Sequence, residues 1–493
     1  MKIYLHGHEN KYAVEQMLLT LYPNERPEYP GGTPTGDRIE ISRRSGGTWL
    51  TVTAKLVSAG EAYIGSARHK IAELNSELLL DRYTQRMIKT AFYRAYLRAG
   101  NVKPAWGSLT GVRPTKLMTA LLDSGASPAE ALRDYIDEFG VTPLRAKLCL
   151  DASLATVSAE KSLSSRDICL YVGIPFCPTR CDYCSFVSQS VEKSMKLIPP
   201  FLDALYREIA ATAEVVRHCG LRVISVYMGG GTPTTLSAPQ LDTLCTLLAE
   251  SFDLSALREY TVEAGRPDTI TREKLEVLRR HGVDRISVNP QTMCDRVLST
   301  IGRRHTAADI LSALNLVRQV GGFAVNMDLI AGLRSDTPAD FEATVKAVLA
   351  LSPENITVHT LSMKKGSRLT LEGSDMPPAE EVGQMLDFAI NSLKAADYSP
   401  YYLYRQKFMA GGFENIGWCK KGYESLYNIC IMEELCGILA MGGGGSTKLV
   451  APGDGRNLRL MAPKYPTEYI SHIEKIMADK IKIKEFYNGI SAK

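Results

Sequence analysis

The chain has 493 residues and a formal net charge of +4, so it is long enough for two or three domains of the usual size of about 100–200 residues. The charge is not concentrated in a long basic run, which excludes the usual electrostatic signature of nucleic-acid binding. No apolar stretch reaches the roughly 18 residues that a membrane span requires, and the first residues lack the apolar core of a signal peptide. We therefore expect a cytoplasmic protein with neither a nucleic-acid partner nor a membrane span, whose cysteines are free thiols or metal ligands.

The first 160 residues combine short strand-like runs with longer helical patterns, which predicts a separate α+β domain. Its role is open, and we take substrate gating or partner docking as the working hypothesis. The expected strands are Ile3–Gly7, Arg38–Ser42 and Leu50–Leu56, and the expected helices are Lys11–Leu21, residues 70–99 and Pro128–Glu138.

Residues 165–380 show a regular alternation of strand and helix patterns. Strands that alternate with helices of this length form βα units around a parallel sheet. Six units are too few to close an eight-stranded barrel, so we predict an α/β fold, an open (βα)6 partial barrel with its site at the carboxyl ends of the strands. The expected strands are Ile168–Ile174, Val223–Met228, Tyr260–Glu263, Arg285–Val288, Val325–Ile330 and Ile356–Leu361. The expected helices are Phe201–Arg217, Ala238–Ser251, Arg272–His281, Ala307–Val320, Pro338–Leu351 and Ala379–Ala395.

The last segment, residues 381–493, shows no further βα unit. Helical patterns near Ser425–Leu439 and Glu468–Asp479 flank a run of glycines, Gly442–Gly445. We therefore predict a mainly helical C-terminal cap, which gives three expected domains at residues 1–160, 165–380 and 381–493.

A cysteine motif directly follows the first strand of the predicted barrel. Cys177, Cys181 and Cys184 stand in the spacing Cys-x3-Cys-x2-Cys. Three thiolates can hold a [4Fe–4S] cluster and leave one of its four irons without a protein ligand, which makes that iron available for chemistry. The alternative is a zinc site, which needs four ligands; no second cysteine pair follows, and Cys169 lies in an apolar, strand-like run. A disulfide is less favoured still, because nothing in the sequence indicates secretion.

Polar or glycine residues follow the other strands of the predicted barrel at the same end. Alone, each would be read as a solvated or structural group, but together they place one such feature per strand on one rim, which is typical of a small-molecule site. They are the glycine run Gly229-Gly-Gly-Thr-Pro-Thr234, then Glu263, Gln291, Arg303 and Asp328.

The cysteine motif, the glycine run and the partial barrel together resemble the radical S-adenosylmethionine (SAM) superfamily. The segments Ile174–Cys177, Cys181–Cys184, Gly229–Thr234 and Asn326–Ile330 resemble, more closely, the family of oxygen-independent coproporphyrinogen III oxidases (dehydrogenases). The segments Trp106–Lys116 and Tyr401–Lys407 are similar to its HemZ-like branch. The resemblance implies a [4Fe–4S] cluster and one or two molecules of SAM as cofactors.

The resemblance also assigns roles to individual residues. It implies that Cys177, Cys181 and Cys184 bind the cluster. It implies SAM contacts through Tyr171, Tyr183, Gly230, Gly231, Thr232, Glu263, Gln291, Arg303, Asp328 and Ser362.

The activity implied by the resemblance is oxidative decarboxylation of two propionates of coproporphyrinogen III to give protoporphyrinogen IX, in anaerobic heme biosynthesis. It further implies an electron donor such as a flavodoxin or a ferredoxin. The four carboxylates of this tetrapyrrole substrate would need basic partners. The candidates are Arg113, Lys364, Lys365, Arg368 and Arg405.

Two positions depart from the well-characterised decarboxylases of this family. Those enzymes have histidine where this chain has Gly173, and a fourth cysteine where it has Phe186. The form Cys-x-Tyr-Cys-x-Phe also occurs in relatives that act as heme chaperones, although their histidine-bearing heme segment is not evident here. Three functions therefore stay open: the decarboxylase, a heme-binding chaperone, and another radical reaction on a tetrapyrrole such as methyl transfer or ring cleavage.

Overall fold

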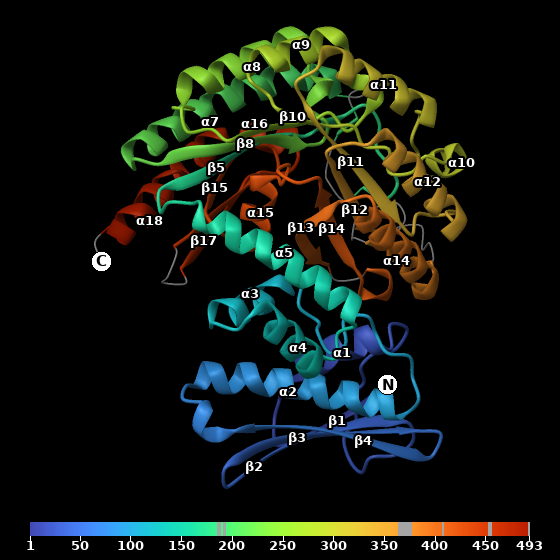
Figure 1. The fold of residues 1–493 in the computed structure, drawn as a ribbon. Helices are drawn as coiled ribbons and strands as arrows, with labels where there is room; N and C mark the ends of the chain where they lie inside the picture. The colour runs from blue at the N-terminus through green and yellow to red at the C-terminus, as the bar shows by residue number, and fades with distance from the viewer. Residues whose placement is uncertain (185–188, 191–193, 363–376, 407–408, 452–455, 492–493) are drawn as a thin grey trace. The chain divides into compact units, whose positions relative to one another are not determined.

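The computed structural model describes residues 1–184, 189–190, 194–362, 377–406, 409–451 and 456–491. The chain forms two compact units (Figure 1). One comprises Met1–Leu150 with Gly411–Phe413, and the other comprises Asp151–Ala410 with Glu414–Lys493. No helix in the described part of the chain combines the length and the apolar character needed to cross a membrane.

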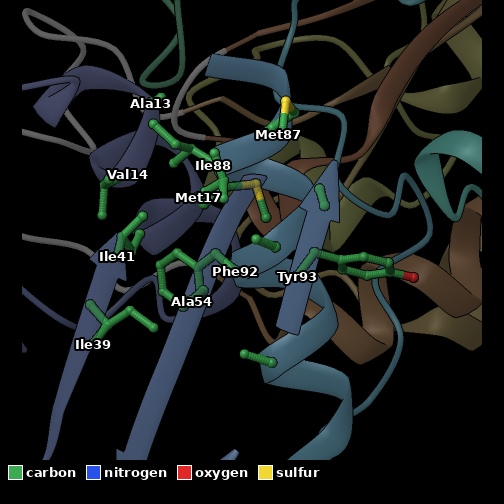
Figure 2. Close-up of a cluster of buried hydrophobic side chains, with 14 of the residues drawn as sticks. Ala13, Val14, Met17, Ile39, Ile41, Ala54, Met87, Ile88, Phe92 and Tyr93 are labelled. Atoms are coloured by element: carbon green, nitrogen blue, oxygen red, sulfur yellow. The ribbon is translucent and has the colours of Figure 1, made fainter. Parts of the chain in front are cut away.

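The N-terminal unit is built on a four-stranded sheet in the order β1-β2-β3-β4, in which only the β1–β2 pair is parallel. Alternate residues of β3, such as Val52 and Ala54, are fully buried, so the sheet presents one apolar face. Helices α1 and α2 cover that face with Met17, Ile88 and Phe92 (Figure 2). The elements are β1 Lys2–His6, α1 Lys11–Leu21, β2 Arg38–Gly46, β3 Trp49–Ser58, β4 Glu61–Lys70, α2 Glu77–Arg98, α3 Thr115–Asp123 and α4 Pro128–Phe139. Helix α5, Pro143–Lys161, begins in this unit and ends in the second.

The second unit contains the predicted partial barrel. Six parallel strands follow one another as neighbours in the order in which they occur in the chain, and each expected strand and helix is present within a few residues of its predicted bounds, which confirms the fold class. The helices lie on the convex side of the curved sheet (Figure 1). The strands are β5 Asp167–Ile174, β8 Arg222–Gly230, β9 Glu259–Glu263, β10 Arg285–Ser287, β11 Ala324–Ala331 and β12 Asn355–Thr360. The helices are α7 Ile198–His218, α8 Ala238–Ser251, α9 Arg272–Arg280, α10 Asp295–Thr300, α11 Ala307–Val320, α12 Pro338–Leu351 and α14 Ala379–Ala395.

The C-terminal segment contains helices, as predicted, and also five strands that the sequence analysis did not predict. These strands extend the sheet at both edges: β15 pairs in parallel with β5, and β14 pairs antiparallel with β12. Helix α15 packs inside the curve of the sheet, on its concave side (Figure 1). The domain boundary near residue 380 stays a prediction. The elements are β13 Ser399–Arg405, β14 Glu414–Cys419, α15 Leu426–Glu433, β15 Gly437–Gly442, β16 Ser446–Val450, β17 Asn457–Met461, α16 Pro466–Ser471, α17 Ile473–Asp479 and α18 Ile481–Ser491.

A buried ion pair fastens the end of β15 to the barrel. Glu208 on α7 is 1% exposed, and its carboxylate lies 2.7 Å from the Nζ atom of Lys480. The same carboxylate accepts hydrogen bonds from the backbone N–H of Gly442 (2.8 Å) and from the hydroxyl of Tyr469 (2.5 Å). The turn after β15 is therefore fixed by the buried carboxylate of Glu208, which also contacts Lys480 and Tyr469.

We predict that Lys480→Met lowers the free energy of unfolding by about 3 kcal/mol, because it leaves the carboxylate of Glu208 buried without its cation. Lys482→Met is the control: the Lys482 side chain is 47% exposed and pairs with Asp479, so its loss should cost less than about 1 kcal/mol. Chemical denaturation followed by circular dichroism measures both. Equal effects of the two substitutions would contradict the importance of the buried pair.

Candidate active site

All thirteen residues that the sequence analysis assigned to the cluster and to SAM line one cavity of about 540 Å³. The cavity lies where the parallel strands of the barrel end, as expected for this class of fold. The strands and the turns that follow them contribute the predicted lining residues Tyr171, Cys177, Cys181, Tyr183, Cys184, Gly230, Gly231, Thr232, Glu263, Gln291, Arg303, Asp328 and Ser362.

The cysteine loop, defined here as residues 177–184, follows the end of β5 and presents to the cavity three cysteine side chains that form no disulfide. The Sγ atom of Cys181 accepts a hydrogen bond from Nη1 of Arg266 at 3.5 Å, and the Sγ atom of Cys177 lies 3.4 Å from the hydroxyl of Thr232. Among the described residues, the three loop thiols do not all lie within 4.8 Å of one another, as three ligands of a single zinc ion would. Thiolates with separate positions suit a cluster of several irons better than one ion.

The glycine turn after β8 packs directly against the chain that enters the cysteine loop. The N–H of Gly231 donates to the carbonyl of Ile174 (2.8 Å), and the N–H of Thr232 donates to the carbonyl of Phe176 (2.7 Å). A Cβ atom at Gly231 would lie 2.5 Å from the carbonyl oxygen of Phe176, and Gly230 has φ +110°. Position 231 therefore requires glycine because a side chain would clash with Phe176. Position 230 requires glycine because of its left-handed backbone conformation.

Gly173 lies against a second glycine turn, the one that follows β15. A Cβ atom at Gly173 would lie 2.7 Å from the carbonyl oxygen of Gly443, and a Cβ atom at Gly442 would lie 2.2 Å from the carbonyl oxygen of Gly173. Backbone of the C-terminal segment thus occupies the space that a side chain at position 173 would need. The histidine of the family's decarboxylases does not fit here, whereas the second departure, Phe186, lies outside the described residues.

Glu263 places a carboxylate above the first glycine turn. Its Oε1 atom accepts a hydrogen bond of 2.5 Å from the hydroxyl of Tyr227, and its Oε2 atom would lie 2.9 Å from a Cβ atom at Gly229. Burial raises the pKa of Glu263 from 4.5 to about 7, and the charge of nearby Asp328 also raises it. A cation bound in the cavity would favour the ionised form of this group.

Asp328 on β11 is held by two amides. Its carboxylate accepts hydrogen bonds from Nδ2 of Asn289 (2.7 Å) and from Nδ2 of Asn326 (2.8 Å). Gln291 lies beside the same strand, with its N–H on the carbonyl of Asp328 at 2.9 Å and with φ +67°. A left-handed conformation at a residue other than glycine is strained, and such strain is concentrated at functional sites.

Arg303 is 9% exposed and links the cysteine loop to the other rim residues. Its Nη2 atom donates to the hydroxyl of Tyr183 at 2.7 Å, and its Nη1 atom donates to the carbonyls of Gly265 and Asn289 at 3.3 Å each. Its Nε atom is buried and has no partner among the described residues. Because Arg303 also lines the cavity, its guanidinium group suits an anionic ligand.

Two lining residues that the sequence analysis did not assign, Tyr227 and Tyr427, form an aromatic wall with Tyr171; the aromatic wall is defined here as these three tyrosines. The rings of Tyr227 and Tyr427 are stacked with centroids 4.3 Å apart, and Tyr171 lies 6.3 and 6.2 Å from them in nearly parallel orientation. Tyr427 comes from α15, far along the chain, so no local pattern indicated it. The other missed lining residues include Arg266, Asn289, Asn326, His359, Tyr402, Tyr404, Asn428, Ile431 and Met432.

The basic residues proposed for the substrate do not gather at this cavity in the described part of the chain. Arg405 is buried on β13 and is not among the residues that line it, and Arg113 belongs to the N-terminal unit. Lys364, Lys365 and Arg368 lie outside the described residues. Among the described lining residues, Arg266 and Arg303 are the arginines, and both contact the cysteine loop.

Comparisons with known proteins indicate the same superfamily as the cysteine motif and the glycine run. A profile of the radical SAM superfamily matches residues 171–348. The oxygen-independent coproporphyrinogen-III oxidase-like protein HemZ of Bacillus subtilis (strain 168) is 35% identical over 468 residues, 93% of this chain and 92% of that protein. The heme chaperone HemW of the same organism is 31% identical over 253 residues, 50% of this chain and 64% of that protein. The chain also aligns with the solved structure of coproporphyrinogen III oxidase HemN from Escherichia coli, which is described as a radical SAM enzyme. The alignment covers 66% of this chain and 72% of that chain, with a TM-score of 0.52 and 24% sequence identity, and it shows that the two share a fold.

We predict that Gly231→Ala reduces iron incorporation several-fold, because the new methyl group would displace the carbonyl of Phe176 and with it the cysteine loop. Gly46→Ala is a matched control, since a Cβ atom there meets nothing within 4 Å. Iron analysis after anaerobic reconstitution measures the effect. Full iron content in the Gly231→Ala protein would show that the contact does not hold the loop.

The raised pKa of Glu263 predicts a pH-dependent contribution to stability. The folded protein keeps this proton up to pH about 7, whereas an unfolded chain releases it near pH 4.5, so stability is lost as pH rises through that window. The free energy of unfolding falls by at most roughly 3 kcal/mol across this window. Water in the cavity screens the charge of Glu263 and makes the decrease smaller. Glu263→Gln should make the decline between pH 5 and pH 8 smaller in thermal melts without SAM. An identical pH profile in both proteins would refute the assignment.

Proposed function

Because the chain belongs to the radical SAM superfamily, and within it to the family that includes HemZ, HemN and HemW, we propose that it oxidatively decarboxylates two propionates of coproporphyrinogen III. The cofactors of the superfamily are a [4Fe–4S] cluster and SAM. The single observation that carries the proposal is the cavity itself. Three thiols, the polar residues Glu263, Arg303 and Asp328, and the aromatic wall all line this one cavity.

When both cofactors are bound, they supply a 5′-deoxyadenosyl radical that removes a hydrogen atom from substrate. The residues of this chain bind and orient them. Glu263 would offer a carboxylate to the ammonium of SAM, and the guanidinium of Arg303 would pair with the carboxylate of SAM. Asp328, fixed by its two amide partners, is suited to accept from ribose hydroxyls.

The aromatic wall suits a large, partly apolar substrate. The three tyrosines give the cavity aromatic carbon atoms and hydroxyl groups, which suit the pyrrole rings and propionates of a porphyrinogen. Each propionate, –CH2–CH2–COO⁻, becomes a vinyl group, –CH=CH2, by loss of one CO2, one hydrogen atom and one electron. The electron requires an acceptor, and reduction of the cluster requires a donor such as a flavodoxin or a ferredoxin.

A second candidate function is that of a heme chaperone. The observation that favours it is the glycine turn Gly442–Gly443, which excludes the histidine of the family's decarboxylases at position 173. The relative named heme chaperone HemW is similar over half of this chain. In that case the aromatic wall would bind heme and no propionate would be lost.

An anaerobic turnover assay separates the two. Reconstituted protein, reductant, SAM and coproporphyrinogen III are mixed, and products are followed by mass spectrometry. We expect two successive losses of CO2 coupled to 5′-deoxyadenosine, abolished in Cys181→Ala and retained in Cys245→Ala, which alters a buried cysteine on α8. Cleavage of SAM with an unchanged porphyrinogen would overturn the substrate assignment, and stoichiometric heme binding by the same preparation would then favour the chaperone.

A further inference from the structure

Three other cysteines of the second unit converge on one point in its core. Cys169 lies on β5, Cys430 on α15, and Cys436 immediately before β15. Their Sγ atoms all lie within 4.8 Å of one another, and those of Cys169 and Cys436 are 3.7 Å apart. All three residues are at most 5% exposed. We call this group the core thiol cluster.

The spacing of the core thiol cluster suits sulfur ligands of one metal ion. A metal–sulfur distance of about 2.3 Å places two ligand sulfurs roughly 3.8 Å apart in a tetrahedral site and roughly 4.0 Å apart in a planar trigonal site. The separation of 3.7 Å between Cys169 and Cys436 is close to these values, and the three thiols are free. The loop cysteines do not converge in this way, so the chain contains two different arrangements of three thiols.

The simplest alternative is that the three thiols only fill space, since buried cysteine often behaves as a small apolar side chain. Their neighbours, including Ile224, Leu426 and Ile438, are indeed apolar. Hydrogen bonds between the thiols, such as the one of 3.7 Å between Cys169 and Cys436, also bring them together, but the convergence of three thiols from separate elements is at the same time the arrangement that a metal ion requires. Thiols are soft ligands, and an apolar shell around them favours a soft ion.

We propose that Cys169, Cys430 and Cys436 bind one soft, closed-shell metal ion, and that Cu(I) fits the site best. Among the described residues, no histidine, aspartate or glutamate joins the three sulfurs at the same distance. Structural zinc is almost always four-coordinate, whereas thiolate sulfur selects Cu(I), which accepts three ligands. The site is separate from the cysteine loop that holds the cluster.

A bound ion would link β5 to α15, and each of these elements contributes a tyrosine to the aromatic wall. Cys169 is two residues from Tyr171 on β5, and Cys430 is three residues from Tyr427 on α15. Tyr427 belongs to the same buried cluster, and Tyr171 and Tyr227 pack against it. Metal binding at this point would fix α15 and β15 to the strand that leads into the cysteine loop, and its free energy would add to that of folding.

The test uses the full chain with Cys177, Cys181 and Cys184 all replaced by alanine, so that loop thiols cannot compete. The protein is treated anaerobically with Cu(I) buffered by a competing chelator, desalted and analysed for copper. We expect about one copper per chain, three sulfur neighbours by X-ray absorption, and a higher thermal midpoint with copper than without. Cys430→Ser in this background should lower copper retention at least about tenfold, and the matched Cys245→Ser should not.

Copper well below one equivalent in the parent protein, or equal copper in the Cys430→Ser and Cys245→Ser proteins, would overturn the site. Retention of zinc and not copper in parallel samples would overturn the Cu(I) assignment. The thermal shift of the parent protein requires no substitution in the core thiol cluster, so the test stands even where Cys430→Ser fails to fold. Wild-type protein with its cluster reconstituted provides a second comparison, in which copper is counted beside unchanged iron.

Discussion

The site depends on how the end of β5 is held between two glycine turns. β5 lies between β8 and β15 in the sheet, and each neighbour ends in a turn that touches the β5 backbone just before Cys177. Gly231 contacts Phe176 on one side, and Gly442 contacts Gly173 on the other. The turn after β15 is held in turn by the buried carboxylate of Glu208. These close backbone contacts restrict the conformation of the cysteine loop. A site that binds a cluster through three sulfur atoms needs those atoms at fixed positions.

The same constraint explains a departure from the family pattern. Gly173 is required because the backbone of the C-terminal segment occupies the space beside it, so any side chain at this position would need the turn after β15 to shift. Whatever a histidine does at this position in other members, a different group must do it here or the reaction must differ. The polar side chains that line this cavity and offer a replacement include Glu263, which has a pKa near neutrality, His359 and the tyrosines of the aromatic wall.

Sequence patterns predicted the barrel and much of the site for a physical reason. Buried parallel strands are short apolar runs that stand out between helices, and the residues that end them, such as Glu263 and Asp328, must share one rim. The strand β4 was missed because only Gly65 and Ala67 of its ten residues are buried, so it shows no apolar alternation. Tyr427 and the core thiol cluster were missed because they are brought together by α15 and β15, whose positions depend on long-range packing.

The central claim is that the cavity binds SAM against an iron–sulfur cluster held by the cysteine loop. Electron paramagnetic resonance of the anaerobically reduced, iron-loaded protein tests it most directly, because SAM bound to the open iron must alter the signal of the cluster. The account predicts a reduced [4Fe–4S] signal that changes on addition of SAM and that is absent in Cys184→Ala. A cluster signal that SAM leaves unchanged, or one that survives loss of Cys184, would contradict it.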